Sequence, residues 1–345
     1  MTHGGGVAVN ARFRVAPQTG VQRVATELCR WITPPLTEIR PARDWSGARN
    51  HLWEQVVLPV RLGGAPLWSP CNTGPVAVAN QVVTIHDAAV LDHPEWFSRV
   101  FRETYRLMWP QLARRARRLV TVSAYSQARL ADALGVPLDR IRVVHNGVDA
   151  AFRPVEIGDA ARRYGVEPGR YFTTLGTLEP RKNLALVYSG WARAQARLPH
   201  DLRLLVIGGA GKASVFSGLG AGPVAGAVAA GFVPDADLPE LLGGSLGLIY
   251  PSRYEGFGLP VVEAMACGAP VVTTRLTSLA EVGGDAALYV DPDDADGTAS
   301  AFVALASSVD LRAELGAKGI ANAARFSWPK AAAAMHEIFH DDLSR

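Results

Sequence analysis

Short apolar runs that favour β-strands alternate with amphipathic helical patterns along most of this sequence. The strand-like runs, rich in β-branched residues, include 81–87, 118–124, 141–147, 171–177, 202–209 and 269–274. The helical patterns between and around them include 20–32, 126–135 and 183–198. Strands separated by helices are typical of parallel α/β sheets with right-handed crossovers. This alternation excludes all-α and all-β folds and predicts an α/β protein.

The pattern occurs twice, which predicts two α/β halves joined near residues 145–155. The length of 345 residues agrees with this, because single cores usually stop growing near 250–300 residues. We expect a cleft between the halves. Ligands of such sheets bind beyond the carboxyl ends of the strands.

Several observations favour a cytoplasmic protein without a membrane span. No segment has the roughly 18 unbroken apolar residues that a span requires, and the first residues lack the pattern of a signal peptide. The most apolar small-residue segment, 218–233, contains Pro223 and is interpreted as a loop and a packed helix. The three cysteines are far apart and show no CxxC spacing, which predicts reduced thiols.

The stretch 254–268 places a glycine-rich turn between a strand and a helix, with Glu255 before the turn and Glu263 after it. Pro260 suits the first helical turn, and Gly268 suits a left-handed helix end. The turn before Pro260 is therefore predicted at a helix N-terminus, where unpaired backbone N–H groups attract anions. We expect Glu263 in the first turn of that helix, with both carboxylates facing the same ligand.

Carboxylates beside an anion site need a partner other than phosphate, and sugar hydroxyls are suitable because they donate charge-assisted hydrogen bonds. We predict that the backbone of the turn binds a diphosphate and that Glu255 and Glu263 bind hydroxyls at the two ends of one ligand. The alternative is that Glu263 only complements the helix dipole and Glu255 is a solvated loop acid.

The run E-G-F-G-L-P-V-V-E (255–263) resembles the signature of retaining glycosyltransferases of family 4. Further resemblances follow the family's order along nearly the whole chain. They lie at 19–23, 68–75, 84–87, 143–149, 175–183, 206–211 and 231–242. The resemblance implies the α/β GT-B fold, with two Rossmann-like domains whose parallel sheets face each other across a deep cleft. It implies an acceptor-binding domain at 1–153, a nucleotide-sugar-binding domain at 154–325, and a helix at 326–345 that crosses back to the first domain.

The resemblance also implies roles for individual residues. Arg181 and Lys182 would clamp the diphosphate, Glu255 would bind the sugar and Glu263 the ribose, while His86 would lie near the reacting carbon. The implied catalytic residues are His86, Arg181, Lys182 and Glu255. The implied donor-binding residues are Gly20, Arg181, Lys182, Phe232, Val233, Glu255, Gly256, Phe257, Gly258, Leu259 and Glu263. Many members have Arg directly after the glycine of the 175–183 motif, where this chain has Thr177, so Arg181 is expected to substitute for it.

By the same resemblance, the chain would transfer a hexose with retention of configuration and without a metal or other cofactor. GDP-mannose is the first expected donor, and a glycan or lipid-linked acceptor in bacterial surface polysaccharide synthesis is the expected acceptor. Donors carrying UDP or dTDP remain alternatives, as do a nucleotide-sugar epimerase and a non-catalytic sugar-nucleotide binder on the same fold. A glycoside hydrolase also uses two carboxylates, but it leaves Arg181 and Lys182 without a role.

Three other ligand-binding patterns are not matched by this sequence. The segment 208–214 lacks two positions of the phosphate-binding P-loop, and no GxGxxG follows the first strand. The acidic run 291–297 has Ala295 where a calcium loop needs a ligand, so it is predicted to be a capped helix start.

Positive charge is concentrated in the first half, which has a net charge of +8 through residue 154 against −5 for the remainder. Residues 97–119 hold seven arginines among aromatic and apolar residues: Arg99, Arg102, Arg106, Arg114, Arg115, Arg117 and Arg118. The plain interpretation is an amphipathic helix with solvated arginines. The alternative is a surface that docks on anionic lipid headgroups at the inner face of the cell membrane. Nucleic acid is not expected, because no nucleic-acid-binding motif accompanies the charge.

Overall fold

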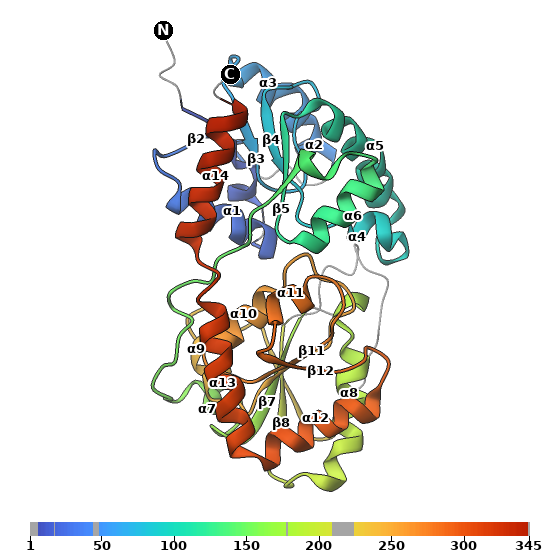
Figure 1. Ribbon diagram of the computed structural model, residues 1–345, viewed down its shortest axis with the longest axis vertical. Coiled ribbons are helices and arrows are strands. Elements are labelled where there is room, and N and C mark those ends of the chain that lie inside the picture. Colours follow the sequence, from blue (N-terminus) through green and yellow to red (C-terminus); the bar gives the residue numbers. More distant parts are fainter. Residues whose placement is uncertain (1–5, 17, 44–47, 177–178, 209–223, 344–345) are drawn as a thin grey trace. The chain divides into compact units, whose positions relative to one another are not determined.

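The computed structural model describes residues 6–16, 18–43, 48–176, 179–208 and 224–343. The chain divides into two compact units (Figure 1). Unit 1 comprises residues 1–92, 99–147 and 327–345, and unit 2 comprises 93–98 and 148–326. The sequence-based boundaries were 153/154 and 325/326, whereas the two units divide at 147/148 and 326/327.

Unit 1 contains a six-stranded parallel sheet in the order β2-β1-β3-β4-β5-β6. Its strands are β1 (Ala8–Asn10), β2 (Thr37–Ile39), β3 (Leu67–Ser69), β4 (Gln81–Thr84), β5 (Arg118–Thr121) and β6 (Ile141–Val143). Its helices are α1 (Gly20–Trp31), α2 (Ala48–Leu52), a π-helical turn (Trp53–Val57), α3 (Leu58–Leu62), α4 (Ala89–Asp92), α5 (Arg99–Arg115), α6 (Ala124–Leu134) and α14 (Trp328–Leu343).

Unit 2 contains a second six-stranded parallel sheet, in the order β12-β11-β10-β7-β8-β9. Its strands are β7 (Tyr171–Leu175), β8 (Arg203–Ile207), β9 (Ala227–Gly231), β10 (Leu248–Tyr250), β11 (Val271–Thr273) and β12 (Ala287–Tyr289). Its helices are α7 (Ala160–Arg163), a 3₁₀ turn (Pro180–Lys182), α8 (Leu184–Ala194), α9 (Leu238–Gly243), α10 (Leu259–Ala266), α11 (Leu279–Gly283), α12 (Ala295–Ser307) and α13 (Val309–Ala323). The predicted α/β class is confirmed in both units.

Local chemistry explains several helix ends. Ser123 caps α6 by accepting a hydrogen bond from the backbone N–H of Ser126, and Gly135 ends that helix in the left-handed conformation. Asp294 caps α12 by accepting from the backbone N–H groups of Asp296 and Gly297. The acidic run 291–297 is therefore a capped helix start, as predicted.

Each sheet is covered by helices that bury aromatic side chains against it. In unit 2, Phe302 of α12 packs edge-on against Phe172 of β7 at 4.9 Å and against Trp191 of α8 at 5.3 Å, measured between ring centroids. In unit 1, Trp68 of β3 is fully buried and its ring lies 5.7 Å from that of Phe339 on α14. Figure 1 shows α14 lying beside α1, so the last described helix completes the core of unit 1.

One predicted helix is a strand. The segment 218–233 was interpreted as a loop and a packed helix, but Ala227–Gly231 forms β9 at the edge of the second sheet, paired with β8. Its small residues fit an edge that is only partly buried, and this parallel pairing is a long-range contact that local composition does not reveal. Residues 218–223 lie outside the described residues. Among the described residues, the helices are too short or too polar to cross a bilayer.

Candidate active site

The candidate site lies where the strand order of unit 2 reverses. From β7 the chain proceeds to β8 and β9 on one side of the sheet, and then returns to β10, which pairs with the other side of β7. Loops leaving neighbouring strands in opposite directions create a binding position beyond their carboxyl ends. The 3₁₀ turn Pro180–Lys182 follows β7, and the loop holding Glu255 follows β10, so the sheet brings the two motifs together.

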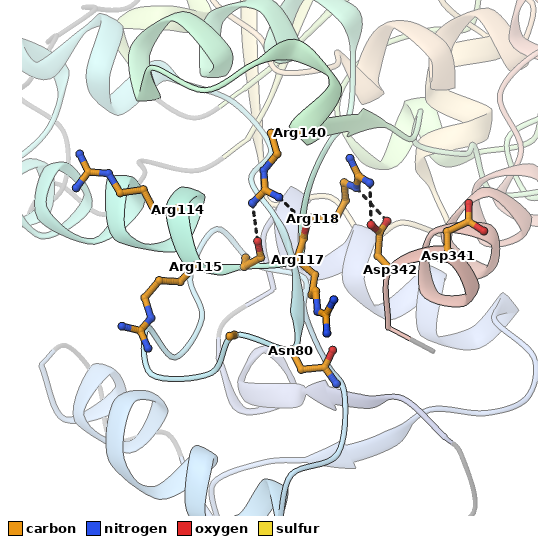
Figure 2. A pocket seen from close by; sticks show the side chains of 10 residues that line it. Asn80, Arg114, Arg115, Arg117, Arg118, Arg140, Asp341 and Asp342 are labelled. Carbon is orange, nitrogen blue, oxygen red and sulfur yellow. Dashed lines mark hydrogen bonds and ion pairs between the residues drawn. The ribbon is translucent and has the colours of Figure 1, made fainter. Parts of the chain in front are cut away.

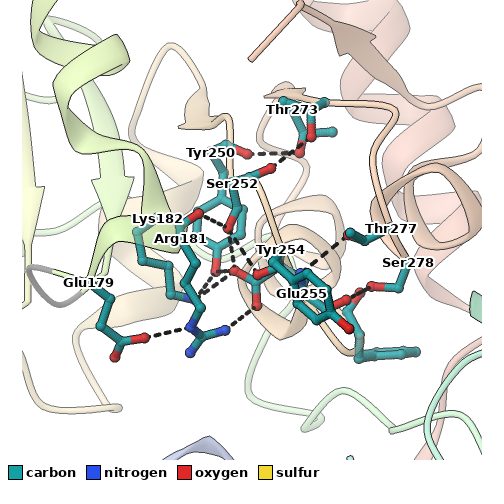
Figure 3. A network of polar contacts seen from close by, with 12 residues as sticks. Glu179, Arg181, Lys182, Tyr250, Ser252, Tyr254, Glu255, Thr273, Thr277 and Ser278 are labelled. Carbon is teal, nitrogen blue, oxygen red and sulfur yellow. Dashed lines mark hydrogen bonds and ion pairs between the residues drawn. The ribbon is translucent and has the colours of Figure 1, made fainter. Parts of the chain in front are cut away.

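Glu255 is the centre of a buried polar network (Figure 3). Lys182 Nζ and the Tyr250 hydroxyl each donate a hydrogen bond to Glu255 Oε1 at 2.7 Å. Ser252 Oγ donates to the same oxygen at 2.7 Å, and the Arg181 guanidinium donates to Oε2 at 3.1 Å. The side chain is 7% exposed, so the carboxylate is held almost entirely by protein groups.

Both cations of the pair are further constrained. Arg181 Nε donates to Glu179 Oε2 at 2.5 Å, and Lys182 Nζ also donates to the Tyr250 hydroxyl at 2.5 Å. Asn183, in the left-handed conformation, donates its side-chain amide to the carbonyl oxygens of Pro251 and Pro292. These bonds fix the turn after β7 against the loop after β10, so the two positive charges are presented in a defined place.

The electrostatics of this cluster follow from burial and charge. Burial alone would raise the pKa of Glu255, but the positive charges of Lys182 and Arg181 outweigh it and lower that pKa to about 2. Burial and the neighbouring Arg181 lower the pKa of Lys182 from its usual range, and the charge of Glu255 opposes them. Burial, followed by the negative charge of Glu255, raises the pKa of Tyr250. The carboxylate is therefore ionised at neutral pH, while the phenol stays protonated and donates to it.

The glycine-rich turn has the predicted place before a helix. Gly258 precedes α10 with a φ of 103°, and a Cβ at this position would lie 2.9 Å from Leu279 Cδ2, so the turn requires glycine. Ser278 Oγ donates to the carbonyl oxygens of Glu255 and Phe257 at 2.9 and 3.0 Å. Phe257 is buried and its ring lies 5.4 Å from that of Phe326, which anchors the turn in the core of unit 2.

Other predicted donor-binding residues of unit 2 occupy different surroundings. Gly256 lies inside the turn, and Leu259 is the first residue of α10, one position earlier than the predicted start at Pro260. Glu263 is consequently in the second turn and not the first, which corrects the prediction, and it is buried. Phe232 follows β9 and is 83% exposed, whereas Val233 is buried.

The two predicted site residues of unit 1 lie at the carboxyl edge of its sheet. His86 follows β4 and is buried, and its Nε2 donates to the Pro70 carbonyl oxygen at 2.9 Å, which leaves Nδ1 unprotonated in the neutral ring. Burial lowers the pKa of His86, so the ring is neutral at pH 7. Gly20 is the first residue of α1, after the capping residue Thr19, and a Cβ there would meet no atom within 4 Å. Thr177 lies outside the described residues.

Sequence reasoning missed three members of the network: Glu179, Tyr250 and Ser252. Their positions carried a usable signal, because Tyr250 ends one buried strand, Ser252 follows it, and Glu179 precedes the basic pair after the neighbouring strand. Within the part of the chain that the structure describes, no group of three or more His, Cys, Asp or Glu side chains is arranged to hold a metal ion.

Both units of the chain match families of known proteins. The family described as "Glycosyl transferases group 1" matches residues 169–308, and "Glycosyltransferase Family 4" matches residues 65–152. The O-antigen chain mannosyltransferase B of Escherichia coli is 33% identical over 267 residues, which cover 74% of this chain and 68% of that protein. The D-inositol 3-phosphate glycosyltransferase of Acidothermus cellulolyticus is 33% identical over 243 residues, which cover 66% of this chain and 54% of that protein.

Solved structures resemble this one over nearly its whole length. Anabaena Alr3699/HepE, in complex with UDP-glucose, superposes with a TM-score of 0.77 at 17% identity, covering 97% of this chain and 99% of that one. WaaG, a glycosyltransferase involved in lipopolysaccharide biosynthesis, gives a TM-score of 0.67 at 16% identity, covering 96% and 99%. At these identities the likeness concerns the fold, which is GT-B.

Proposed function

This chain belongs to glycosyltransferase family 4, and on that premise we propose that it transfers a hexose, with retention of configuration, from a nucleotide sugar to a glycan or lipid-linked acceptor. GDP-mannose is the proposed donor and bacterial surface polysaccharide the proposed product. The mannosyltransferase name of the E. coli relative supports this choice. UDP- and dTDP-sugars are the alternative donors.

The observation that carries the proposal is the Arg181–Glu255–Lys182 cluster at the strand-order reversal. A diphosphate is the anion best suited to two adjacent, preorganised cations. In the structure, the Glu255 carboxylate contacts both cations. We infer that the donor diphosphate replaces Glu255 on Arg181 and Lys182, and that this exchange frees the carboxylate for sugar hydroxyls.

The proposed roles follow from this exchange. Arg181 and Lys182 offset the charge that develops on the leaving diphosphate, and the N-terminus of α10 adds backbone N–H groups. Tyr250 and Ser252 keep Glu255 oriented toward the sugar while the cations are engaged. Catalysis then consists of positioning the donor and acceptor and stabilising the leaving group, without a bound metal.

The remaining predicted residues complete the proposed donor site. Glu263 binds the ribose hydroxyls, and the backbone at Phe232 and Val233 flanks the base. Gly20 lets the start of α1 approach the phosphates. His86, held neutral, lies beside the donor sugar, and its Nδ1 is available to accept a hydrogen bond.

A membrane-linked acceptor is part of the proposal. The arginines of α5 would bring the enzyme to anionic headgroups at the cytoplasmic face, where such acceptors are presented. The buried apolar residues of α5 include Tyr105, Met108 and Trp109. These face the core, whereas Val100 and Leu107 of the same helix are exposed, so α5 would offer a membrane two apolar side chains beside its charge.

The hydrolase alternative is disfavoured by the charge state of Glu255. A glycosidase needs one carboxyl group that stays protonated near neutral pH to act as a general acid. The pKa of about 2 excludes Glu255 as that acid, so a hydrolase would need Glu263 for the role and would still leave Arg181 and Lys182 without one. An epimerase or a non-catalytic binder would use the same donor contacts, so turnover with an acceptor must separate those alternatives.

The test combines binding with transfer. Thermal unfolding with excess GDP, UDP, TDP and ADP should show selective stabilisation by GDP, since a ligand at 100 times its Kd adds about 2.7 kcal/mol. GDP-mannose and a mannan-type acceptor should then give a product with an α-linkage by NMR, and Glu255→Ala should abolish its formation. If only UDP or TDP stabilises the protein, the proposed donor changes to a UDP- or dTDP-sugar. Binding without transfer to any acceptor, or release of free sugar, would refute the transferase assignment.

A further inference from the structure

Unit 1 carries a hollow lined by arginines at the edge of its sheet opposite to His86. The cavity measures about 540 Å³, and its walls include Arg114, Arg115, Arg117, Arg118 and Arg140 (Figure 2). The polar side chain of Asn80 lines it too. This volume falls within the range of sites for small molecules.

The strand directions show that this hollow is separate from the proposed active site. Asn80 directly precedes β4, and Arg118 is the first residue of β5, so both lie at the amino ends of neighbouring parallel strands. Arg140 likewise precedes β6. His86 follows the carboxyl end of β4 and therefore lies at the opposite edge of the sheet from these three residues. The proposed donor chemistry therefore leaves these arginines unused.

Two of the guanidinium groups are fixed in place. Arg140 donates to the carbonyl oxygens of Ala113, Ala116 and Arg117 at 3.3, 2.7 and 3.2 Å, where α5 ends. Arg118 makes a two-pronged ion pair with Asp342 of α14, at 3.0 and 2.7 Å. Figure 2 shows the bonds from Arg140 to Ala116 and Arg117 and the ion pair between Arg118 and Asp342. The wall of the hollow is thus rigid at its centre.

The hollow has more arginines than the carboxyl end of α5 needs to balance its helix dipole. One or two basic residues in the last turn complement the helix dipole, and Arg140 already binds the Ala113 carbonyl group in that turn and two carbonyl groups just beyond it. Arg114 and Arg115 are exposed, and among the described residues neither has a carboxylate partner. Asp341 and Asp342 are the acidic side chains that line the hollow, so five arginines face two aspartates.

We propose that this hollow binds a phosphate-bearing anion with at least two negative charges, at a site separate from the donor site. One guanidinium group can bind two oxygens of a phosphate at once, and several arginines from different elements can surround the same phosphate. Arg140 and Arg118 provide the fixed wall, while Arg114 and Arg115 close on the ligand. The same chemistry occurs in soluble diphosphates and in phospholipid headgroups.

Paired variants test the site with inorganic pyrophosphate as the probe. Arg114→Ala/Arg115→Ala removes two exposed charges from the hollow, and Arg99→Ala/Arg106→Ala removes two from the same helix outside it. Pyrophosphate bound at the donor site contributes equally to both variants. In calorimetry, the binding event at the hollow should therefore disappear, or weaken at least tenfold, only in Arg114→Ala/Arg115→Ala. Asp341→Asn, which removes a negative charge from the wall, should tighten the same event.

A second measurement identifies the source of the phosphate. Cosedimentation with phosphatidylglycerol vesicles, against phosphatidylcholine vesicles as control, should fall at least tenfold further in Arg114→Ala/Arg115→Ala than in Arg99→Ala/Arg106→Ala if the ligand is a lipid headgroup. Unchanged vesicle binding with lost pyrophosphate binding assigns the site to a soluble anion. Equal behaviour of the two double variants in both measurements would overturn the proposal, because the charge of α5 would then act without a specific site.

Discussion

Replacing Glu255 by Gln should make the protein bind GDP more tightly although it transfers less sugar. The substitution keeps the shape of the side chain and removes its charge. This carboxylate holds Lys182 at 2.7 Å and Arg181 at 3.1 Å, so a diphosphate bound by both cations would have to displace it. GDP carries no sugar and so gains nothing from the freed carboxylate. For GDP alone, Glu255 acts as a competitor.

The size of the effect follows from the pKa of Glu255, which falls from 4.5 to about 2. That difference corresponds to about 3 kcal/mol of net attraction between the carboxylate and its surroundings. It limits the gain in GDP affinity to roughly 100-fold. Because Tyr250 and Ser252 continue to hold the displaced carboxylate in the native protein, we expect a gain of about tenfold.

The same pKa predicts a loss of stability for Glu255→Gln in the absence of ligand. Since folding lowers this pKa, the stabilisation is fully present above pH 4.5 and is lost as the pH falls toward 2. The variant should therefore be less stable by about 3 kcal/mol at pH 7, and the gap to the native protein should narrow below pH 4.5.

Isothermal titration calorimetry with GDP at pH 7 measures the affinity directly, and Glu263→Gln is the matched control. Glu263 is proposed to bind the ribose, so its variant should weaken GDP binding. If Glu255→Gln also weakens binding, the carboxylate does not compete with the diphosphate and the proposed exchange of partners is wrong.

Three further substitutions test other parts of the structure. Because burial lowers the pKa of His86, the native protein should lose stability as the pH falls below about 6.5, and His86→Gln should flatten this dependence in urea unfolding at pH 5 and pH 8. Gly208→Ala places a Cβ 2.2 Å from the Gly176 carbonyl oxygen at a φ of 134°, so denaturant unfolding should show a loss of about 2–4 kcal/mol. Tyr250→Phe removes a donor to Glu255 and should lower kcat about tenfold with little change in KM; an unchanged kcat would mean that Glu255 is oriented without it.

The parts of this structure that local chemistry decides could be predicted from the sequence. Gly258 and Pro260 mark the start of α10 because their backbone constraints act within one turn. Ser123 and Asp294 mark helix starts for the same reason.

The parts that depend on pairing between distant segments could not be predicted. The small residues of β9 become a strand only because β8 lies beside them. Likewise, Arg181 and Lys182 reach Glu255 from the turn after β7 only because the order of strands places β7 beside β10, and no spacing within one motif reveals that order. The predicted position of Glu263 within α10 was wrong by one residue, because the helix begins at Leu259 and not at Pro260.

The return of α14 to unit 1 determines the order in which the chain can fold during synthesis. Unit 1 needs residues that the ribosome makes before and after Val148–Phe326, so unit 2 has all of its strands before unit 1 has its last helix. At 5–20 residues per second, translating that segment takes roughly 10–40 s. For that time Trp68 lacks the ring of Phe339, and the face that α14 covers is open to solvent. The nascent chain therefore has its greatest need for chaperones while its second half is already folding.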